Sequence, residues 1–176
     1  MQWYNVSIEN RRSYMSQKKL SIWLKAIIIC TGLIGVLACA VIIPNIGKAI
    51  IASYPDRPEM QNWFVPWLIF ALISAVPCYL ALISAWKIAR EISRDNSFSH
   101  KNARSMKNIS IFALIDSVYV FAGNIVMMLL KMTHGSVFIS LMLVTVVGLI
   151  ITVAAACLSH LIEKAAILKD ENDEII

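Results

Sequence analysis

Hydrophobic and polar positions along the chain alternate in long blocks. Four apolar stretches, each of about 18 residues or more, cover 26–43, 63–86, 109–130 and 137–159. A helix rises about 1.5 Å per residue, so such a stretch is long enough to cross a hydrocarbon core of about 30 Å. Backbone N–H and C=O groups in lipid must pair within their own segment, which a single apolar run achieves only as a helix. The pattern therefore predicts an all-α integral membrane protein, a four-helix bundle with four transmembrane helices.

The distribution of charge supports this prediction and gives it an orientation. Of the 176 residues, 59% are apolar and 15% are charged, whereas a soluble domain carries about a quarter charged residues. Thirteen of the 16 Lys and Arg lie in three segments, 1–25, 87–108 and 161–176. Short cytoplasmic loops carry the excess of Lys and Arg in membrane proteins. We therefore expect a multi-pass protein with both termini in the cytoplasm.

The same three segments define the polar parts of the chain. Residues 1–25 form a basic cytoplasmic arm, which is either an interfacial helix or a loose arm. Residues 87–108 form an inner loop, and residues 161–176 form an acidic tail that extends the fourth helix. The outer connection, 44–62, contains three prolines and is too short for a folded domain.

The inner loop has the sequence of a helical hairpin. We expect the second helix to continue to Arg94 and a turn to follow at Asp95, because short polar side chains satisfy backbone groups outside helices. Ser99 is a good N-cap for the next helix. Phe98, just before it, is expected to turn back toward the membrane.

The first span could also be read as a signal peptide, because Ala38, Cys39 and Ala40 resemble a cleavage site or a lipoprotein signal. The apolar run continues past Cys39 to Ile43, and the basic region before it is long for a signal. We therefore expect the full-length chain to be retained.

No recognisable catalytic chemistry accompanies the spans. All four cysteines lie inside spans, and no two form a C-x-x-C pair: Cys30, Cys39, Cys78 and Cys157. Buried thiols behave as small hydrophobic side chains. No two histidines lie at ligand spacing on one helix, so we expect no metal and no cofactor. Phosphate-binding, zinc-protease and nucleophile-elbow motifs are absent from the sequence. An enzyme is not expected.

One formal charge lies inside a predicted span. Asp116 is about seven residues into the third span, and such residues face the bundle interior by default. Asn124 follows eight residues later on the same side of the helix. Two interpretations remain: a proton or ion relay, or interhelical hydrogen bonding, for example to Tyr79 or Ser84 of the second helix. Pro77 is expected to kink that helix.

Small residues recur at every fourth position on two helices. Gly148, Thr152 and Ala156 do so on the fourth helix, and Thr31 and Gly35 on the first. Small residues allow helices to approach closely in lipid. They indicate packing within the bundle, and a homo-oligomer is the alternative.

The acidic tail and the basic loop are expected on the same side of the membrane. We expect the tail to fold back on the loop or to be offered to a basic partner, since runs of charge act over about 8 Å at physiological salt. The candidate partner-contact residues are Phe98, Arg94, Lys101, Arg104, Asp170, Glu171 and Asp173.

Two runs of residues resemble a known family. One is Asn96-Ser97-Phe98-Ser99 followed by Asn102 and Met106-Lys107-Asn108-Ile109. The other is Lys164-Ala165-Ala166, Lys169, Glu171-Asn172-Asp173 and Ile176. With four spans in this order, the chain resembles the DUF2975 family of small bacterial four-span membrane proteins. The resemblance implies a bundle in the bacterial cytoplasmic (inner) membrane with no assigned enzymatic activity. It also implies a pairing with a small helix-turn-helix regulator, which is often encoded beside members.

These observations lead to one functional hypothesis and two alternatives. The hypothesis is a non-enzymatic membrane protein that contacts the lipid bilayer and binds a cytoplasmic regulator protein at its inner face, with no direct contact to nucleic acid. One alternative is a small transporter or ion-conducting oligomer that uses Asp116 and Asn124. The other is an immunity or stress protein of the membrane.

Overall fold

The computed structural model describes residues 2–53, 59–94 and 96–174, with side chains for 18–49, 51–53, 62–94 and 96–172. The described elements are helical throughout. They are α1 (Gln2–Leu37), η1 (Ala38–Ile42), α2 (Ile43–Ser53), α3 (Glu59–Ile92), α4 (His100–Leu129) and α5 (Gly135–Glu174). Four helical stretches are long and apolar enough to cross a membrane: Lys18–Ser53, Asn62–Ile92, His100–Leu129 and Gly135–Asn172. The predicted four spans are confirmed, and each belongs to a longer helix.

The first helix does not end at Pro44, and this corrects the expected outer connection of 44–62. The short π-helical turn η1 precedes the proline, and the Ile43 N–H donates to the carbonyl of Ala38, five residues back. A π-turn widens the helix and is a known way to accommodate an interruption in the hydrogen-bond ladder. The missing N–H of proline and its ring are tolerated next to this wider turn. Helix therefore continues to Ser53.

The N-terminal segment also belongs to a long helix. α1 begins at Gln2 and runs without a break into the first span. The side chains of Trp3, Tyr4 and Tyr14, on which an interfacial role would depend, lie outside the described residues. On the second spanning helix, Pro66 and Pro77 both lie inside α3, which is continuous through them.

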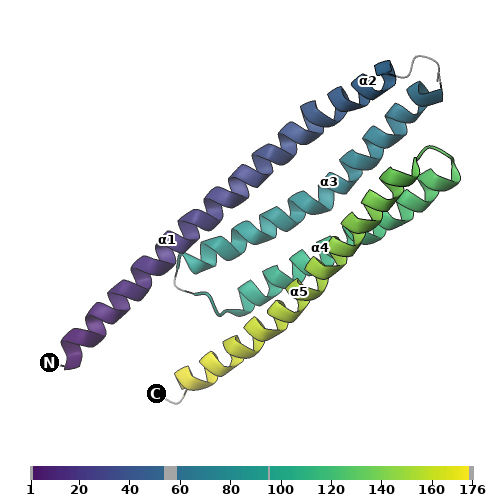
Figure 1. Cartoon of the computed structure of the whole chain (residues 1–176). Helices are drawn as coiled ribbons and strands as arrows, with labels where there is room; N and C mark the ends of the chain where they lie inside the picture. Colours follow the sequence, from purple (N-terminus) through teal and green to yellow (C-terminus); the bar gives the residue numbers. More distant parts are fainter. Residues whose placement is uncertain (1, 54–58, 95, 175–176) are drawn as a thin grey trace.

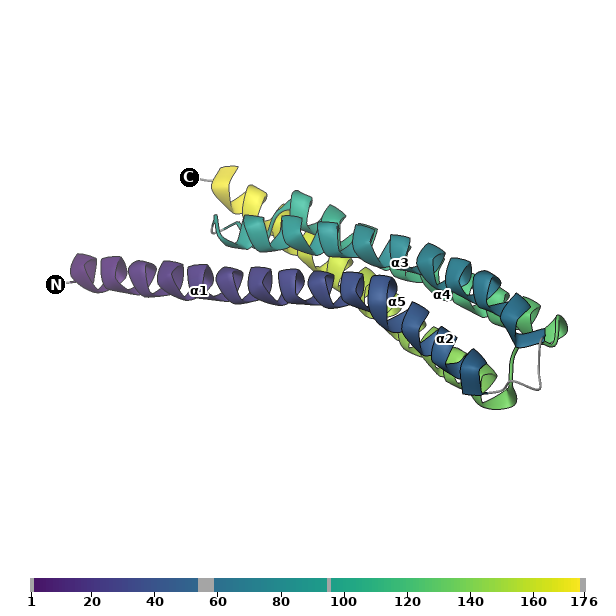
Figure 2. The ribbon, with the colours of Figure 1, turned by 90° about the horizontal axis from the view of Figure 1, so that it is seen from above.

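The helices pack as an open bundle in chain order (Figure 1). α1 packs on α3, α3 on α4, and α4 on α5. In the described part of the chain, no Cα atom of α1 lies within 8 Å of one in α4 or α5. Both termini and the α3–α4 connection lie at one end, which we call the basic end. Seen from above, α5 crosses at an angle to α3 (Figure 2).

The closest pair, α4 and α5, is joined along a seven-residue repeat of small and polar residues. On α4 the repeat is Ala103, Ser110, Ser117 and Asn124, all of them buried. Opposite them on α5 are Ser159, Thr152, Gly148 and Phe138. Ser110 Oγ donates to the Thr152 carbonyl (2.9 Å), Ser159 Oγ to the Ala103 carbonyl (2.8 Å) and Asn124 Nδ2 to the Phe138 carbonyl (3.0 Å). Small residues and interhelical hydrogen bonds are the usual source of helix association in lipid.

The α3–α4 contact is more apolar. Phe70 of α3 packs with Val120 and Met127 of α4, and its ring stacks on Tyr119 with centroids 5.1 Å apart. A Cβ on Gly123 would collide with the Phe70 ring. The missing side chain of Gly123 therefore leaves the space on α4 that the Phe70 ring of α3 occupies.

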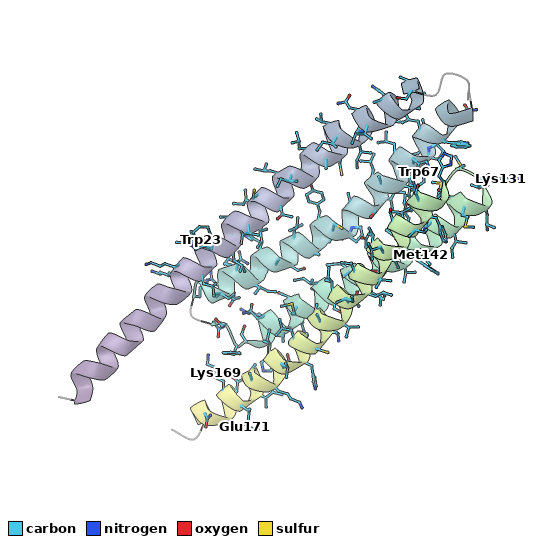
Figure 3. The ribbon with its side chains drawn as sticks, in the orientation of Figure 1. Trp23, Trp67, Lys131, Met142, Lys169 and Glu171 are labelled. Carbon is cyan, nitrogen blue, oxygen red and sulfur yellow. The ribbon has the colours of Figure 1, made fainter. Side chains whose placement is uncertain are left out.

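The contact of α1 with α3 is thinner and uses a few polar anchors. Ser21, fully buried, donates from Oγ to the Ala89 carbonyl at 2.7 Å. The Tyr79 hydroxyl donates to the Gly32 carbonyl at 2.9 Å, and a Cβ on Gly35 would lie 2.7 Å from the same hydroxyl. Trp23 lies on the outward side of α1 (Figure 3) and is 71% exposed, as expected for a side chain that faces lipid.

Candidate functional site

The connection between α3 and α4 is held in a defined shape by its own side chains. Ser99, with extended φ of −141° and ψ of 152°, caps α4, and its Oγ accepts from the Asn102 N–H at 3.3 Å. This confirms the predicted N-cap. Asn102 is 1% exposed, and its Nδ2 donates to the carbonyls of Ser97 (2.8 Å) and Asn96 (3.3 Å). Asp95, in the predicted turn, lies outside the described residues. A buried amide therefore braces the connection from inside.

Phe98 lies within this braced segment and is 58% exposed. A large apolar side chain left accessible between polar residues is typical of a contact surface rather than of a core. Its turn toward the membrane stays a prediction.

The braced segment is attached to the far end of α5 by His100. Its Nδ1 lies 2.7 Å from Glu163 Oε1, and its Nε2 lies 3.2 Å from Asp170 Oδ2. The hydrogen bond and the charge of Glu163 raise the pKa of His100 above 6.5, partial desolvation opposes them, and Asp170 adds to the increase. The imidazolium form, which has two N–H donors, suits both carboxylates.

The tail also reaches the connection through a lysine. Lys169 Nζ donates to Asn96 Oδ1 at 3.3 Å, and Figure 3 shows Lys169 on the side of α5 that faces the α3–α4 connection. Glu171 is exposed. The side chain of Asp173 lies outside the described residues. The expected contact between tail and loop is therefore present, through Lys169 and Asp170 in particular.

The partners in this contact differ from those expected. Arg94 lies 3.6 Å from Glu91 of its own helix end. Lys101 and Arg104 are exposed, and no carboxylate lies within 4 Å of them among the described side chains. The register of α4 against α5 places Glu163 and Asp170 within hydrogen-bonding distance of His100. The tail therefore contacts a histidine, and Lys101 and Arg104 remain available.

A groove of about 790 Å³ opens between α4 and α5 at the basic end. Lys101, Arg104 and Lys107 line it from α4, and Ala156, Ser159 and His160 line it from α5. The His100–Glu163 pair lies at its end nearest the tail. Three cations and a second imidazole thus converge on one concave surface.

The intramembrane carboxylate Asp116 joins α4 to α3. Ser74 Oγ donates to Asp116 Oδ1 at 2.7 Å, and Cys78 Sγ lies 3.6 Å from Oδ2. The predicted hydrogen bond from Asp116 to Tyr79 or Ser84 is wrong. The Tyr79 hydroxyl donates to the Gly32 carbonyl of α1, and Ser84 Oγ donates to the Leu80 carbonyl of its own helix. Tyr79 is directed to the α1 side of α3, whereas Ser74 and Cys78 share the side that faces α4.

Asn124 does not continue a path from Asp116. It is fully buried, and its Nδ2 donates to Phe138 of α5, whereas Asp116 is bonded to α3. The Asn124 Oδ1 has no hydrogen-bond partner among the described residues. The two polar groups predicted to share one face are therefore engaged by different helices, because eight residues rotate a helix by about 80°.

The opposite end of the bundle holds a smaller apolar pocket of about 380 Å³ between α2, α3 and the α4–α5 connection. Trp67 closes one side and donates from Nε1 to the Met132 carbonyl at 3.0 Å. Trp67 and Lys131 mark this end in Figure 3. The Thr133 hydroxyl is buried there without a partner among the described residues.

Several of these residues escaped sequence reasoning. His100, Glu163 and Asn102 were not singled out for the hairpin, nor Ser74 and Cys78 for the intramembrane cluster. In the described part of the chain, no three His, Cys, Asp or Glu side chains gather as they would to hold a metal ion.

Comparison with known proteins agrees with this architecture. The family model described as "Protein of unknown function (DUF2975)" matches residues 50–176. The chain is also similar to the uncharacterized membrane protein YoaS of Bacillus subtilis (strain 168). The two are 27% identical over 158 residues, which cover 87% of this chain and 95% of the relative. No solved structure matches significantly. Four membrane-length helices and a family match over more than half the chain lead to one conclusion: this is a multi-pass membrane protein that belongs to the DUF2975 family.

Proposed function

We propose that this protein is a non-enzymatic docking protein of the bacterial cytoplasmic membrane, with both termini and the α3–α4 connection in the cytoplasm. Its basic end binds a cytoplasmic protein. The family resemblance suggests that this partner is a small helix-turn-helix regulator.

The observation that carries the proposal is the rigid presentation of Phe98. Its segment is capped by Ser99, braced by Asn102 and attached to α5 by His100, yet the ring is 58% exposed. Ordering a loop costs about 1–2 kcal/mol per residue. A segment that is already ordered does not incur this cost when it binds, so preorganisation favours affinity.

The orientation rests on the distribution of Lys and Arg. Thirteen of the 16 lie in the arm, the loop and the tail, and these segments lie at the same end of the bundle. Lys101, three residues after Phe98 and with no carboxylate within 4 Å among the described side chains, favours a partner with an acidic surface.

The transporter alternative is supported less well. It requires a continuous intramembrane path, and the hydrogen bonds of Asp116 and Asn124 lead to different neighbours. No observation in the structure favours the immunity or stress alternative.

The test measures binding of the helix-turn-helix protein encoded beside this gene to the full-length protein in nanodiscs. We expect Phe98→Ser to weaken binding by about tenfold or more, the loss typical of an aromatic anchor. Phe98→Leu, which keeps an apolar side chain, should restore most of it. Deletion of Lys169–Ile176 should also weaken binding while insertion is retained.

Two results would contradict the proposal. One is undiminished binding by both Phe98→Ser and the truncated chain. The other is that no such gene lies beside this one and no acidic cytoplasmic protein binds the basic end at physiological salt.

A further inference from the structure

The groove between α4 and α5 contains more positive charge than the fold itself uses. Lys101, Arg104 and Lys107 all line it, and no carboxylate lies within 4 Å of any of them among the described side chains. The one carboxylate at the groove, Glu163, is engaged by His100 at 2.7 Å. Like charges held close together repel one another, so the arrangement favours an anion between them.

The wall of the groove that α5 forms carries one anchored hydroxyl and one exposed imidazole. Ser159 is buried at its base and donates to the Ala103 carbonyl across the helix interface, which fixes the floor. His160 is exposed one residue further along α5. Guanidinium and ammonium groups with an adjacent imidazole are the donor set that recognises phosphate oxygens.

The position of the groove indicates what kind of phosphate it would take. Lys107 lies two residues before the apolar stretch of α4 begins at Ile109, and His160 immediately follows the apolar stretch of α5. The groove therefore lies at the level where these helices leave the hydrocarbon. One turn deeper, Ile111 is 43% exposed on α4 and Val153 is 62% exposed on α5. A cationic surface that continues into exposed apolar side chains matches a molecule with an anionic head and an acyl chain.

We propose that this groove binds the phosphodiester headgroup of an anionic phospholipid, with its acyl chain along the exposed apolar face of α4 and α5. Arg104 and Lys107 hold the phosphate, and Lys101 and His160 flank it. Basic pockets between transmembrane helices are a recurrent form of lipid recognition. A volume of about 790 Å³ lies within the range of small-molecule sites, about 300–1,000 Å³. The inference goes beyond protein docking and does not depend on Phe98.

The test uses the full-length protein purified in detergent and titrated with phosphatidylglycerol, with phosphatidylcholine as the zwitterionic comparison. Native mass spectrometry measures the lipids retained. We expect one preferred phosphatidylglycerol, bound about tenfold more tightly than phosphatidylcholine. Arg104→Gln/Lys107→Gln should weaken phosphatidylglycerol binding by about 30-fold, the factor for two basic residues near an anionic lipid surface.

The matched control is Lys87→Gln/Arg90→Gln, which removes two exposed cations from α3 at the same end of the bundle. It should weaken phosphatidylglycerol binding by less than about threefold, as expected if site geometry rather than total charge decides. Phe98→Ser should leave lipid binding unchanged, which separates this inference from the proposed docking function. If Arg104→Gln/Lys107→Gln does not fold, Lys101→Glu at the rim tests the same site.

Three results would overturn the inference. The first is an equal loss in the groove pair and in the control pair, which would show diffuse attraction to anionic lipid. The second is equal retention of phosphatidylcholine by the wild type. The third is protection against heat by inorganic phosphate equal to that by phosphatidylglycerol, which would assign the groove to a free anion.

Discussion

His100 and Glu163 lie 63 positions apart in the sequence, yet Nδ1 of one is 2.7 Å from Oε1 of the other. The contact joins the first residue of α4 to the terminal part of α5 that extends beyond the apolar stretch. Asp170, two turns further along α5, reaches the other nitrogen of the same imidazole at 3.2 Å. One titratable side chain thus connects the hairpin that carries Phe98 to the C-terminal tail.

We predict that this connection weakens as the pH rises. The pKa of His100 is raised above its ordinary 6.5 by Glu163 and Asp170. A group with a raised folded-state pKa contributes stability that is complete below its unfolded pKa and is lost as the pH rises through the folded pKa. Thermal unfolding from about pH 5.5 to about pH 8.5 should show the wild type more stable than His100→Gln at the acid end, with the difference shrinking above the raised pKa.

His134→Gln is the matched control for this measurement, because His134 lies at the opposite end of the bundle. Its pH profile should follow that of the wild type. A constant difference between His100→Gln and the wild type across the range would show that protonation of His100 does not contribute.

We predict that Asp116 acts as a packing group. Asp116→Asn keeps an acceptor for the Ser74 hydroxyl, so the thermal unfolding midpoint should change little. Asp116→Leu leaves Ser74 and Cys78 without this partner and should cost about 1–2 kcal/mol or less. The double variant Asp116→Leu/Ser74→Ala should lose less stability than the sum of the losses in the two single variants. Loss of ion or substrate flux in a folded Asp116→Asn protein would instead support the transporter alternative.

We predict that Gly123 cannot carry a side chain. A Cβ there would collide with the ring of Phe70, which is packed between Trp67 and Tyr119 and has little room to move. Gly123→Ala should therefore destabilise the protein by about 1–3 kcal/mol. Gly32→Ala is the control, because nothing lies within 4 Å of its added Cβ. Equal unfolding midpoints for the two variants would contradict the α3–α4 packing described here.

We predict the topology from the positive charge of the arm, the loop and the tail. Reporter fusions after Lys48, Lys101 and Ile176 should report the outside, the inside and the inside, respectively. An outside signal at Lys101 would overturn both the orientation and the proposed docking face.

We predict that the N-terminal segment is retained. The intact mass of the membrane-inserted protein should therefore include residues 1–39. A mature form that begins at Cys39 would mean that the lipoprotein interpretation was correct.

The parts of this fold that were predictable depend on local sequence. The four spans follow from continuous apolar runs, and the Ser99 cap follows from a short polar side chain before a helix. The family resemblance is confirmed as well. The extension of helix past Pro44 was not foreseen, because a π-helical turn has no distinctive local sequence and allows the proline to be passed.

The contacts of the candidate site were less predictable, because they depend on how α4 and α5 are aligned. Pairing of His100 with Glu163, rather than of Lys101 with the tail, follows only once the register is known. A signal for that register was present in the sequence: Ser110, Ser117 and Asn124 recur at seven-residue spacing, and so do Thr145, Thr152 and Ser159. A search for repeats of seven, instead of four, would have found this seam.

The same repeat restricts how the protein could transmit a movement across the membrane. Sliding α5 along α4 by one or two residues would break the hydrogen bonds at Ser110, Asn124 and Ser159 together and press larger side chains into the seam. The next matching alignment lies seven residues away, a displacement of about 10.5 Å at the helical rise. Sliding of α5 along its own axis is therefore disfavoured, and α4 and α5 should move together as one rigid body. α1, which is attached to α3 by fewer anchors, is then the element most free to tilt.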